Sequence, residues 1–283
     1  MTKQSQDEAA EEPRPQEESP KREAKRISEH RRLRAAMLYE VIRIEGEGEL
    51  ARTPRALWWT GMAAGLSLGF SVLSQALLAA NLPDVGWNTI IEKMGYAVGF
   101  IIVILARQQL FTENTLTAVL PVITAWKLYW VWIMLRLWAI VLAANLVGAF
   151  IFAIAIAYMG LLPPDVSAQV ADISKHMMAN TPMEMFVKGI AAGWLIAALV
   201  WMLPSAENIE IFLIALMTYL IALGGFTHVI AGAVEAFYLW VLQEATTLDV
   251  FFGFLLPTLA GNVVGGTILF ALLSYAQVRD EIR

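Results

Sequence analysis

The 283-residue chain contains no cysteine, which excludes disulfide bonds and thiol chemistry. It also lacks a glycine-rich phosphate loop, a nucleophile elbow and any histidine cluster at metal-ligand spacing. We therefore predict no enzyme, no catalytic residue, no cofactor and no metal site. The first residues contain no apolar stretch that could form the core of a cleavable signal peptide.

Charged residues are scarce beyond residue 55. Residues 1–55 hold 12 of the 20 Lys and Arg and 12 of the 25 Asp and Glu, so the net charge of −5 averages over two different regions. It gives no reason to expect a nucleic-acid partner. Hydrophobic residues make up 58% of the chain, against roughly 45–50% in soluble domains. This excess predicts a protein embedded in a lipid bilayer.

Six apolar runs are long enough to cross a membrane, which takes about 20 residues per helix. They lie at about 56–80, 94–122, 126–158, 183–203, 209–242 and 250–276. An even number of spans places both termini on one side of the membrane. The Lys and Arg before the first span and after the last predict that this side is the cytoplasm.

Three short patterns occur once in each half of the chain, in the same order. Gly61-Met62-Ala63-Ala64-Gly65 returns as Gly189-Ile190-Ala191-Ala192-Gly193, Phe111-Thr112 as Phe226-Thr227, and Asn145-Leu146-Val147-Gly148 as Asn262-Val263-Val264-Gly265. The offsets are 128, 115 and 117 residues. The pattern predicts an all-α membrane protein whose six transmembrane helices form two inverted three-helix repeats, with function where the repeats meet.

The second and fifth predicted spans are interrupted at matching places. A charged and amide-rich stretch at 107–115 interrupts the second, and Gly224-Gly225 begins the interruption of the fifth. Such backbone is tolerated at membrane depth only where it is buried in protein or lines a cavity. Two broken helices are therefore predicted to form a translocation site. The residues expected to support the breaks are Asn114, Asn145, Asn262, Phe111 and Phe226.

The residues before the first span fall into two parts. Residues 1–26 carry mixed charge and predict a disordered cytoplasmic tail. Residues 27–53 have apolar side chains at helical spacing, which fits either an amphipathic helix on the membrane surface or a charged helix packed on the protein's own cytoplasmic face. Residues 54–278 are predicted to form a six-helix channel domain.

Three motifs together resemble the formate/nitrite transporter family, across about residues 50–278. They are Leu110-Phe111-Thr112 at the second-span break, Gly225-Phe226-Thr227-His228 at the fifth, and Pro257, Gly261-Asn262, Gly265 and Gly266 on the sixth span. The stretch 110–120 and Ala231-Gly232-Ala233-Val234-Glu235 look most like the YfdC-like bacterial inner-membrane branch of the family.

The resemblance implies an aquaporin-like fold and a homopentamer in the bacterial inner membrane. Each protomer would have one pore for small monovalent anions such as formate or nitrite. Carried onto this sequence, the narrow apolar rings are Tyr96, Phe100 and Ile221, the polar residues between them are Thr112 and His228, and the outer-vestibule lysine is Lys175. The sequence departs from the family at Thr227, where glutamate is common, at Gly193, where an asparagine is expected, and at Arg107, where a small or neutral residue is usual.

Ionisable side chains inside membrane spans are functional by default. The sequence has Arg107, Glu113, His228 and Glu235 there. Arg107 is expected either to form a structural ion pair with Glu113 or Glu235 or to contact the substrate. At an offset of 115 residues Glu113 matches His228, which would bring a carboxylate near the imidazole and favour its charged form.

The function predicted from these residues is a channel or transporter for small weak-acid anions, coupled to protons through His228. Two alternatives stay open. In the first, Arg107 and Glu113 neutralise each other and the channel passes neutral solutes or weak acids. In the second, the pore is occluded and the protein is a membrane scaffold or sensor that recruits a partner through its charged tail.

Overall fold

The computed structural model describes residues 34–83 and 85–281, and all regular structure within these ranges is helical. The predicted tail, 1–26, and the first part of the predicted helix at 27–53 lie outside the described residues. The elements in chain order are α2 (Ala35–Leu50), α3 (Pro54–Asn81), α4 (Asn88–Glu92), η1 (Lys93–Tyr96), α5 (Ala97–Leu105), α6 (Asn114–Thr117), α7 (Val119–Ala125), α8 (Leu128–Tyr158), α9 (Pro164–Met178), α10 (Pro182–Met202), η2 (Leu203–Ser205), α11 (Glu210–Leu223), α12 (Ala231–Val241), η3 (Asp249–Leu255), α13 (Leu256–Val263), η4 (Val264–Ala271) and α14 (Leu272–Val278).

Five of the described helical segments are long and apolar enough to cross a membrane: Pro54–Asn81, Asn88–Leu105, Leu128–Tyr158, Pro182–Ser205 and Asp249–Val278. The predicted fifth span is made of two shorter apolar helices, α11 and α12. The second span likewise continues into the short helix Asn114–Ala125. The predicted six-span arrangement with broken second and fifth helices is therefore confirmed. The span assignment also did not include α9, a 15-residue helix between the third and fourth predicted spans.

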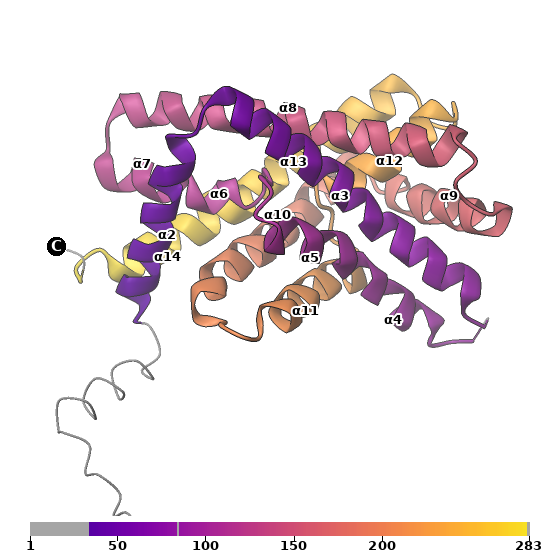
Figure 1. The fold of residues 1–283 in the computed structure, drawn as a ribbon, viewed down its shortest axis with the longest axis horizontal. Coiled ribbons are helices and arrows are strands. Elements are labelled where there is room, and N and C mark those ends of the chain that lie inside the picture. Colours follow the sequence, from indigo (N-terminus) through magenta and orange to yellow (C-terminus); the bar gives the residue numbers. More distant parts are fainter. Residues whose placement is uncertain (1–33, 84, 282–283) are drawn as a thin grey trace, which may run out of the picture. The chain divides into compact units, whose positions relative to one another are not determined.

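Small residues let the long helices of each repeat touch backbone to backbone. In the first repeat α3 packs along α8 (Figure 1), and a Cβ added at Gly65 would lie 2.0 Å from the Asn145 carbonyl oxygen. In the second repeat α10 packs along α13, and a Cβ at Gly193 would lie 2.3 Å from the Asn262 carbonyl oxygen. The two glycine-rich patterns that recur in the sequence therefore make equivalent helix contacts.

Each break begins with one residue in the left-handed region of backbone space. Arg107 has φ 53° and Gly225 has φ 60°, and these two positions are 118 residues apart. One residue later, the N–H groups of Gln108 and Phe226 each donate to a carbonyl five residues back, at 2.9 Å. The chain then runs unwound until α6 or α12 begins. The breaks are thus two copies of one backbone shape.

Helix α2 packs on the protein's own helices. Tyr39 and Ile42 are fully buried, and the Tyr39 hydroxyl lies 2.7 Å from Thr124 Oγ1, at the end of α7. Met37 and Val41 are about half exposed on another face of the same helix, at 53% and 44%. Whether that exposed face also rests on the membrane surface stays a prediction.

Candidate functional site

Asn145, buried in α8, forms hydrogen bonds to the unwound backbone of the first break. Its Oδ1 accepts the N–H of Phe111 at 2.9 Å, and its Nδ2 donates to the carbonyl oxygens of Gly61 at 2.7 Å and Gln109 at 2.9 Å. The unwound backbone therefore finds partners inside the protein, which a broken helix requires at membrane depth.

Asn262, buried in α13, makes the same three hydrogen bonds at the second break. Its Oδ1 accepts the N–H of Val229 at 2.9 Å, and its Nδ2 donates to the carbonyl oxygens of Gly189 at 2.9 Å and Thr227 at 3.0 Å. These bonds fix the structural register of the repeat. Phe111 matches Val229, and Gln109 matches Thr227, each at an offset of 118 residues.

This register corrects the 115-residue alignment of the two breaks. Under the structural offset His228 corresponds to Leu110, and Glu113 corresponds to Ala231. The Phe-Thr pairs that suggested the shorter offset sit on different parts of the two loops: Phe226 follows the left-handed Gly225 directly, whereas Phe111 comes four residues after Arg107. The predicted equivalence of Glu113 and His228 is therefore wrong.

The two breaks meet through a hydrogen bond between Thr112 and His228. Thr112 Oγ1 lies 2.7 Å from His228 Nε2, and both side chains are buried, at 0% and 1% exposed. His228 Nδ1 accepts the N–H of Ala231 at 3.2 Å. A ring nitrogen that accepts a hydrogen bond carries no proton, so the imidazole is neutral with its proton on Nε2 and donates to Thr112. The expected charged imidazole beside a carboxylate is not what this arrangement holds.

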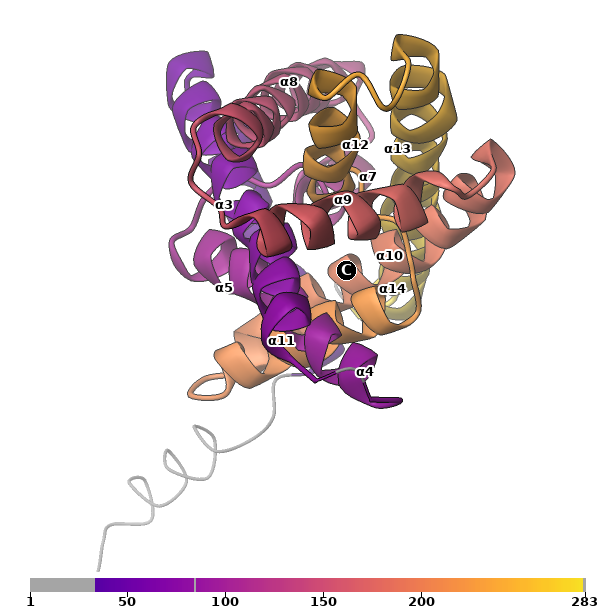
Figure 2. The same cartoon turned by 90° about the vertical axis from the view of Figure 1, so that its right-hand side faces the viewer.

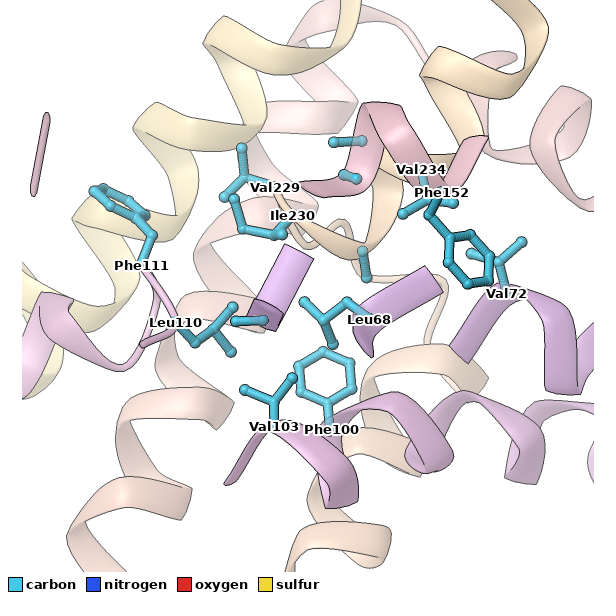
Figure 3. Packing of buried hydrophobic residues seen from close by; sticks show 14 of the residues in the cluster. Leu68, Val72, Phe100, Val103, Leu110, Phe111, Phe152, Val229, Ile230 and Val234 are labelled. Atoms are coloured by element: carbon cyan, nitrogen blue, oxygen red, sulfur yellow. The ribbon is translucent and has the colours of Figure 1, made fainter. Parts of the chain in front are cut away.

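Aromatic and aliphatic side chains close around this pair. The Phe100 ring is 5.0 Å from the His228 ring and the Tyr96 ring is 5.2 Å from the Phe100 ring, measured between centroids. Phe100 and Ile221 are completely buried. Figure 3 shows Leu68, Val103 and Leu110 gathered in the same region as Phe100, and all of them are buried. Val103 is the 118-residue counterpart of Ile221 and was missed in the sequence because it looks like any core residue.

A cavity of about 90 Å³ reaches His228 from one side, and we name it the histidine cavity. Its lining includes Tyr96, Phe226, His228 and Glu235 from the predicted site, together with Thr227 and Gly232. It also includes polar residues that sequence reasoning missed, namely Gln75, Lys93, His176 and Lys188. Lys93 and Lys188 were missed because each lies at the end of a predicted span, where a lysine is ordinarily an interfacial anchor.

A larger cavity of about 640 Å³ reaches the breaks from another side, and we name it the glutamate cavity. Its ionisable lining residues are Glu45, Glu49, Arg107, Glu113 and Glu210. Gln109, also in the lining, donates from Nε2 to Glu49 Oε2 at 2.7 Å, which ties α2 to the first break. Four carboxylates against one guanidinium make the walls of this cavity predominantly acidic.

The two cavities are related by the repeat. Four lining residues of one cavity have a counterpart in the other at the structural offset of 118 residues. The pairs are Arg107 and Gly225, Gln109 and Thr227, Asn114 and Gly232, and Thr117 and Glu235. We name Thr112, His228, Phe100 and Ile221 the buried layer. The histidine cavity is lined by His228 of this layer, and the glutamate cavity by Gln109 and Glu113, which lie close to Thr112 in the chain.

The predicted charge network of Arg107, Glu113 and Glu235 is divided between these cavities. Arg107 pairs with Glu45 of α2 at 2.8 Å instead, and its side chain is 82% exposed. This exposure places the guanidinium outside the buried layer. Glu113 lines the glutamate cavity and Glu235 the histidine cavity. Neither expected ion pair of Arg107 is present among the described residues.

Lys175 lies on α9, which packs against α3 and α12 (Figure 2). Its side chain is 56% exposed and its Nζ lies 2.7 Å from Glu244 Oε2. The Glu244 carboxylate raises the pKa of Lys175 above its ordinary value. The lining of the histidine cavity contains the adjacent His176 rather than Lys175.

The remaining predicted residues support the breaks. Asn114 Nδ2 donates to Gln109 Oε1 at 3.1 Å and to the Leu110 carbonyl at 3.2 Å. The Phe111 ring packs edge-on against Trp138, with centroids 5.5 Å apart. Phe226, half-buried, lines the histidine cavity. No group of three or more metal-ligating side chains occurs within residues 34–83 and 85–281.

Gly193, where the resemblance places an asparagine, touches the Asn262 backbone through its Cα. A Cβ there would lie within 3 Å of three Asn262 backbone atoms. The helix contact between α10 and α13 thus leaves no room for an asparagine at this position.

The sequence and the fold both match known proteins. The profile of the formate/nitrite transporter family aligns with residues 36–276. The chain belongs to this family. "Inner membrane protein YfdC" of Escherichia coli (strain K12) is 47% identical over 249 residues, which cover 88% of this chain and 80% of that protein. The predicted YfdC-like branch of the formate/nitrite transporter family is therefore confirmed.

More distant members share the fold. "Nitrite transporter NirC" of Salmonella typhimurium (strain LT2) is 26% identical over 241 residues, covering 82% of this chain and 87% of that protein. A solved structure titled "FNT family ion channel" superposes with a TM-score of 0.70 at 21% identity and covers 86% of this chain and 96% of its own. The predicted fold class is confirmed, and the family is one of transporters and channels rather than enzymes.

Proposed function

We propose that this chain conducts small monovalent weak-acid anions, such as formate or nitrite, between the histidine cavity and the glutamate cavity. The observation that carries the proposal is the buried Thr112–His228 hydrogen bond, which joins the two repeats between a cavity lined by His228 and one lined by Gln109 and Glu113. Further support comes from relatives named as a formate channel and a nitrite transporter.

The buried layer selects by desolvation. An anion that passes Phe100 and Ile221 loses its water, and a bare charge in an apolar site costs many kcal/mol. Thr112 offsets part of this cost, because its oxygen accepts from His228 and its own hydroxyl proton stays available to donate to the anion. Movement of the His228 Nε2 proton toward the anion would lower the cost further, which couples flux to pH.

The acidic walls of the glutamate cavity favour one variant of this function, in which the neutral acid crosses the layer. Glu45, Glu49 and Glu210 on that side outnumber its one arginine, and they repel a free anion but not the protonated acid. The neutral imidazole also offers no fixed positive charge to hold an anion. A current without swelling of vesicles would argue against the neutral form.

The assembly and the orientation belong to the same proposal. We propose a homopentamer with one passage per protomer, because one structural neighbour is titled "Pentameric formate channel with formate bound" (TM-score 0.66, 19% identity). The bacterial inner membrane is the proposed location, with both termini in the cytoplasm and α2 between a charged tail at 1–26 and the channel domain at 54–278. The glutamate cavity, which α2 lines, would then open to the cytoplasm.

Flux into proteoliposomes tests the proposal. Purified protein is reconstituted, and uptake of formate or nitrite is followed by stopped flow across a range of pH. We expect His228→Ala to abolish the uptake or to change which anion crosses. Unchanged flux and an unchanged pH profile in His228→Ala would contradict the role given to this residue.

A further inference from the structure

One carboxylate in the histidine cavity has no assigned role. Glu235 lies on α12, is only 6% exposed and lines the cavity that reaches His228. Among the described residues, no side chain forms a hydrogen bond or salt bridge with it. A buried carboxylate without a partner is costly as an anion and is therefore readily protonated.

Glu235 faces the same way as the central histidine. His228, Gly232 and Glu235 follow one another at helical spacing, the Gly232 N–H donates to the His228 carbonyl at 2.9 Å, and all three line the cavity. His228 precedes the start of α12 at Ala231, and a Cβ added at Gly232 would lie 2.6 Å from the Phe254 ring, so this ring covers the glycine that lies between the two groups in the sequence.

The other charged and titratable groups of this cavity are Lys93 and Tyr96 from η1, His176 from α9, Lys188 from α10 and His228. Both lysines have partners of their own. Lys93 Nζ lies 2.9 Å from Glu92 Oε1, and Lys188 donates to the Asn180 side-chain oxygen. From α3 the facing group is the neutral Gln75, and from η3 it is Phe254. Lys93 is the charged residue of this cavity that acts on Glu235, and none of these groups forms a hydrogen bond or salt bridge with its carboxyl group in the described part of the chain.

We infer that Glu235 is a proton-exchange residue, which protonates the weak-acid anion in the histidine cavity before it reaches the buried layer. This inference rests on the proposed transport function and assigns the proton to a particular side chain. Lys188, whose partner Asn180 carries no charge, attracts the anion, and Glu235 converts it to the neutral acid that crosses the layer more easily.

The step balances without any further reactant. The O–H bond of the Glu235 carboxylic acid breaks and an O–H bond to the anion forms, which leaves Glu235 as a carboxylate and the substrate as its neutral acid. Water on the open side of the cavity then returns a proton to Glu235. Transport in the opposite direction runs the same exchange in reverse.

The inference is tested by the number of protons that cross with each anion. Proteoliposomes containing the full chain are loaded with a pH-sensitive dye, and formate uptake and internal acidification are recorded together. We expect Glu235→Gln, which keeps the shape of the side chain, to lower proton-coupled uptake roughly tenfold or more, as for the loss of a general acid. Glu235→Asp keeps the carboxyl group and is expected to retain coupling.

Glu244→Gln is the matched control, because it removes an exposed carboxylate beyond the cavity. Equal coupling in Glu235→Gln and wild type would overturn the inference. Loss of coupling in Glu235→Asp to the same extent as in Glu235→Gln would also overturn it, because it would indicate a packing role. If wild-type protein carried no anion at all, the proposed function itself would fail, which is a different result from intact anion flux without proton coupling.

Discussion

Asn145 and Asn262 satisfy the two helix breaks with the same set of three hydrogen bonds, to one backbone N–H and two carbonyl groups each. The two side chains come from different repeats and are both fully buried. They give each unwound loop hydrogen bonds from inside the protein to its backbone. The meeting of Thr112 and His228 depends on both loops keeping this shape.

Replacing either asparagine should therefore unfold its break. We expect Asn145→Ala and Asn262→Ala each to lower stability by about 1–3 kcal/mol or more, because each leaves buried backbone groups without partners. Thermal unfolding of the detergent-solubilised protein measures the effect. Asn81→Ala is the control, since its exposed amide donates only to the Leu77 carbonyl of the same helix. Equal unfolding temperatures for all three variants would contradict the role of the buried amides.

Arg107 occupies a backbone conformation that suits glycine, and its structural counterpart is Gly225. Arg107→Gly and Arg107→Ala both remove the exposed ion pair with Glu45, which is worth little. They differ in backbone freedom, so we expect the glycine variant to be more stable than the alanine variant by about 1 kcal/mol. The comparison is made by thermal unfolding. A more stable alanine variant would show that the break does not require the left-handed conformation.

We predict that the Thr112 hydroxyl accepts a hydrogen bond from His228 and donates one to the anion. Thr112→Val keeps the side-chain shape and removes this donor, and we expect formate flux to fall roughly tenfold, since a hydrogen bond to a charged group is worth about 1.5–3 kcal/mol. Thr124→Val removes a hydrogen bond of the same 2.7 Å length, to Tyr39, away from both cavities. If the two variants lost the same amount of flux, a general loss of packing would explain the effect.

Lys188 of the histidine cavity should matter more for anion capture than Lys93 or Lys175, because its partner Asn180 carries no charge. Lys188→Gln is expected to lower uptake several-fold at low salt and less at high salt, because attraction between charges is screened. Lys93→Gln and Lys175→Gln should have smaller effects, since Glu92 and Glu244 already neutralise these charges. Initial uptake rates at two ionic strengths distinguish these outcomes. A larger loss in Lys175→Gln would restore the vestibule role that the resemblance assigns to it.

The Lys175–Glu244 pair also has a defined pH dependence. Because Glu244 raises the pKa of Lys175, the pair is complete at neutral pH and is lost only as the pH rises through the raised pKa. We therefore expect Glu244→Gln to move the titration of Lys175 to lower pH, which NMR of labelled lysine side chains detects. Because both side chains are substantially exposed, unfolding should be almost unaffected. An unchanged titration would show that the pair does not form in solution.

The fold could be predicted from the sequence because its signals are repeated. The lengths of the apolar runs predict the membrane spans. The asparagines at the breaks and the small residues at the helix contacts are recognisable because the residues around them are apolar. The register of the two breaks could not be predicted, because a shared Phe-Thr pair outweighed the backbone shape set by Arg107 and Gly225. Only the structure shows that both residues have a left-handed φ, of 53° and 60°.

The lining of the cavities was harder to predict than the breaks. Lys93, His176 and Lys188 come from three separate elements, and no spacing in the sequence brings them together. The same holds for Arg107 and Glu45, which meet only because α2 folds back onto the first break. Side chains that depend on such long-range packing have no local pattern.

The most direct test of the account is the flux of formate through wild-type protein in liposomes, measured beside protein that carries both Thr112→Val and His228→Ala. The account predicts rapid, pH-dependent uptake in wild type and uptake no faster than in empty liposomes for the double variant. Equal uptake by the two proteins would show that the anion does not pass between these residues, and the proposed passage would have to be abandoned.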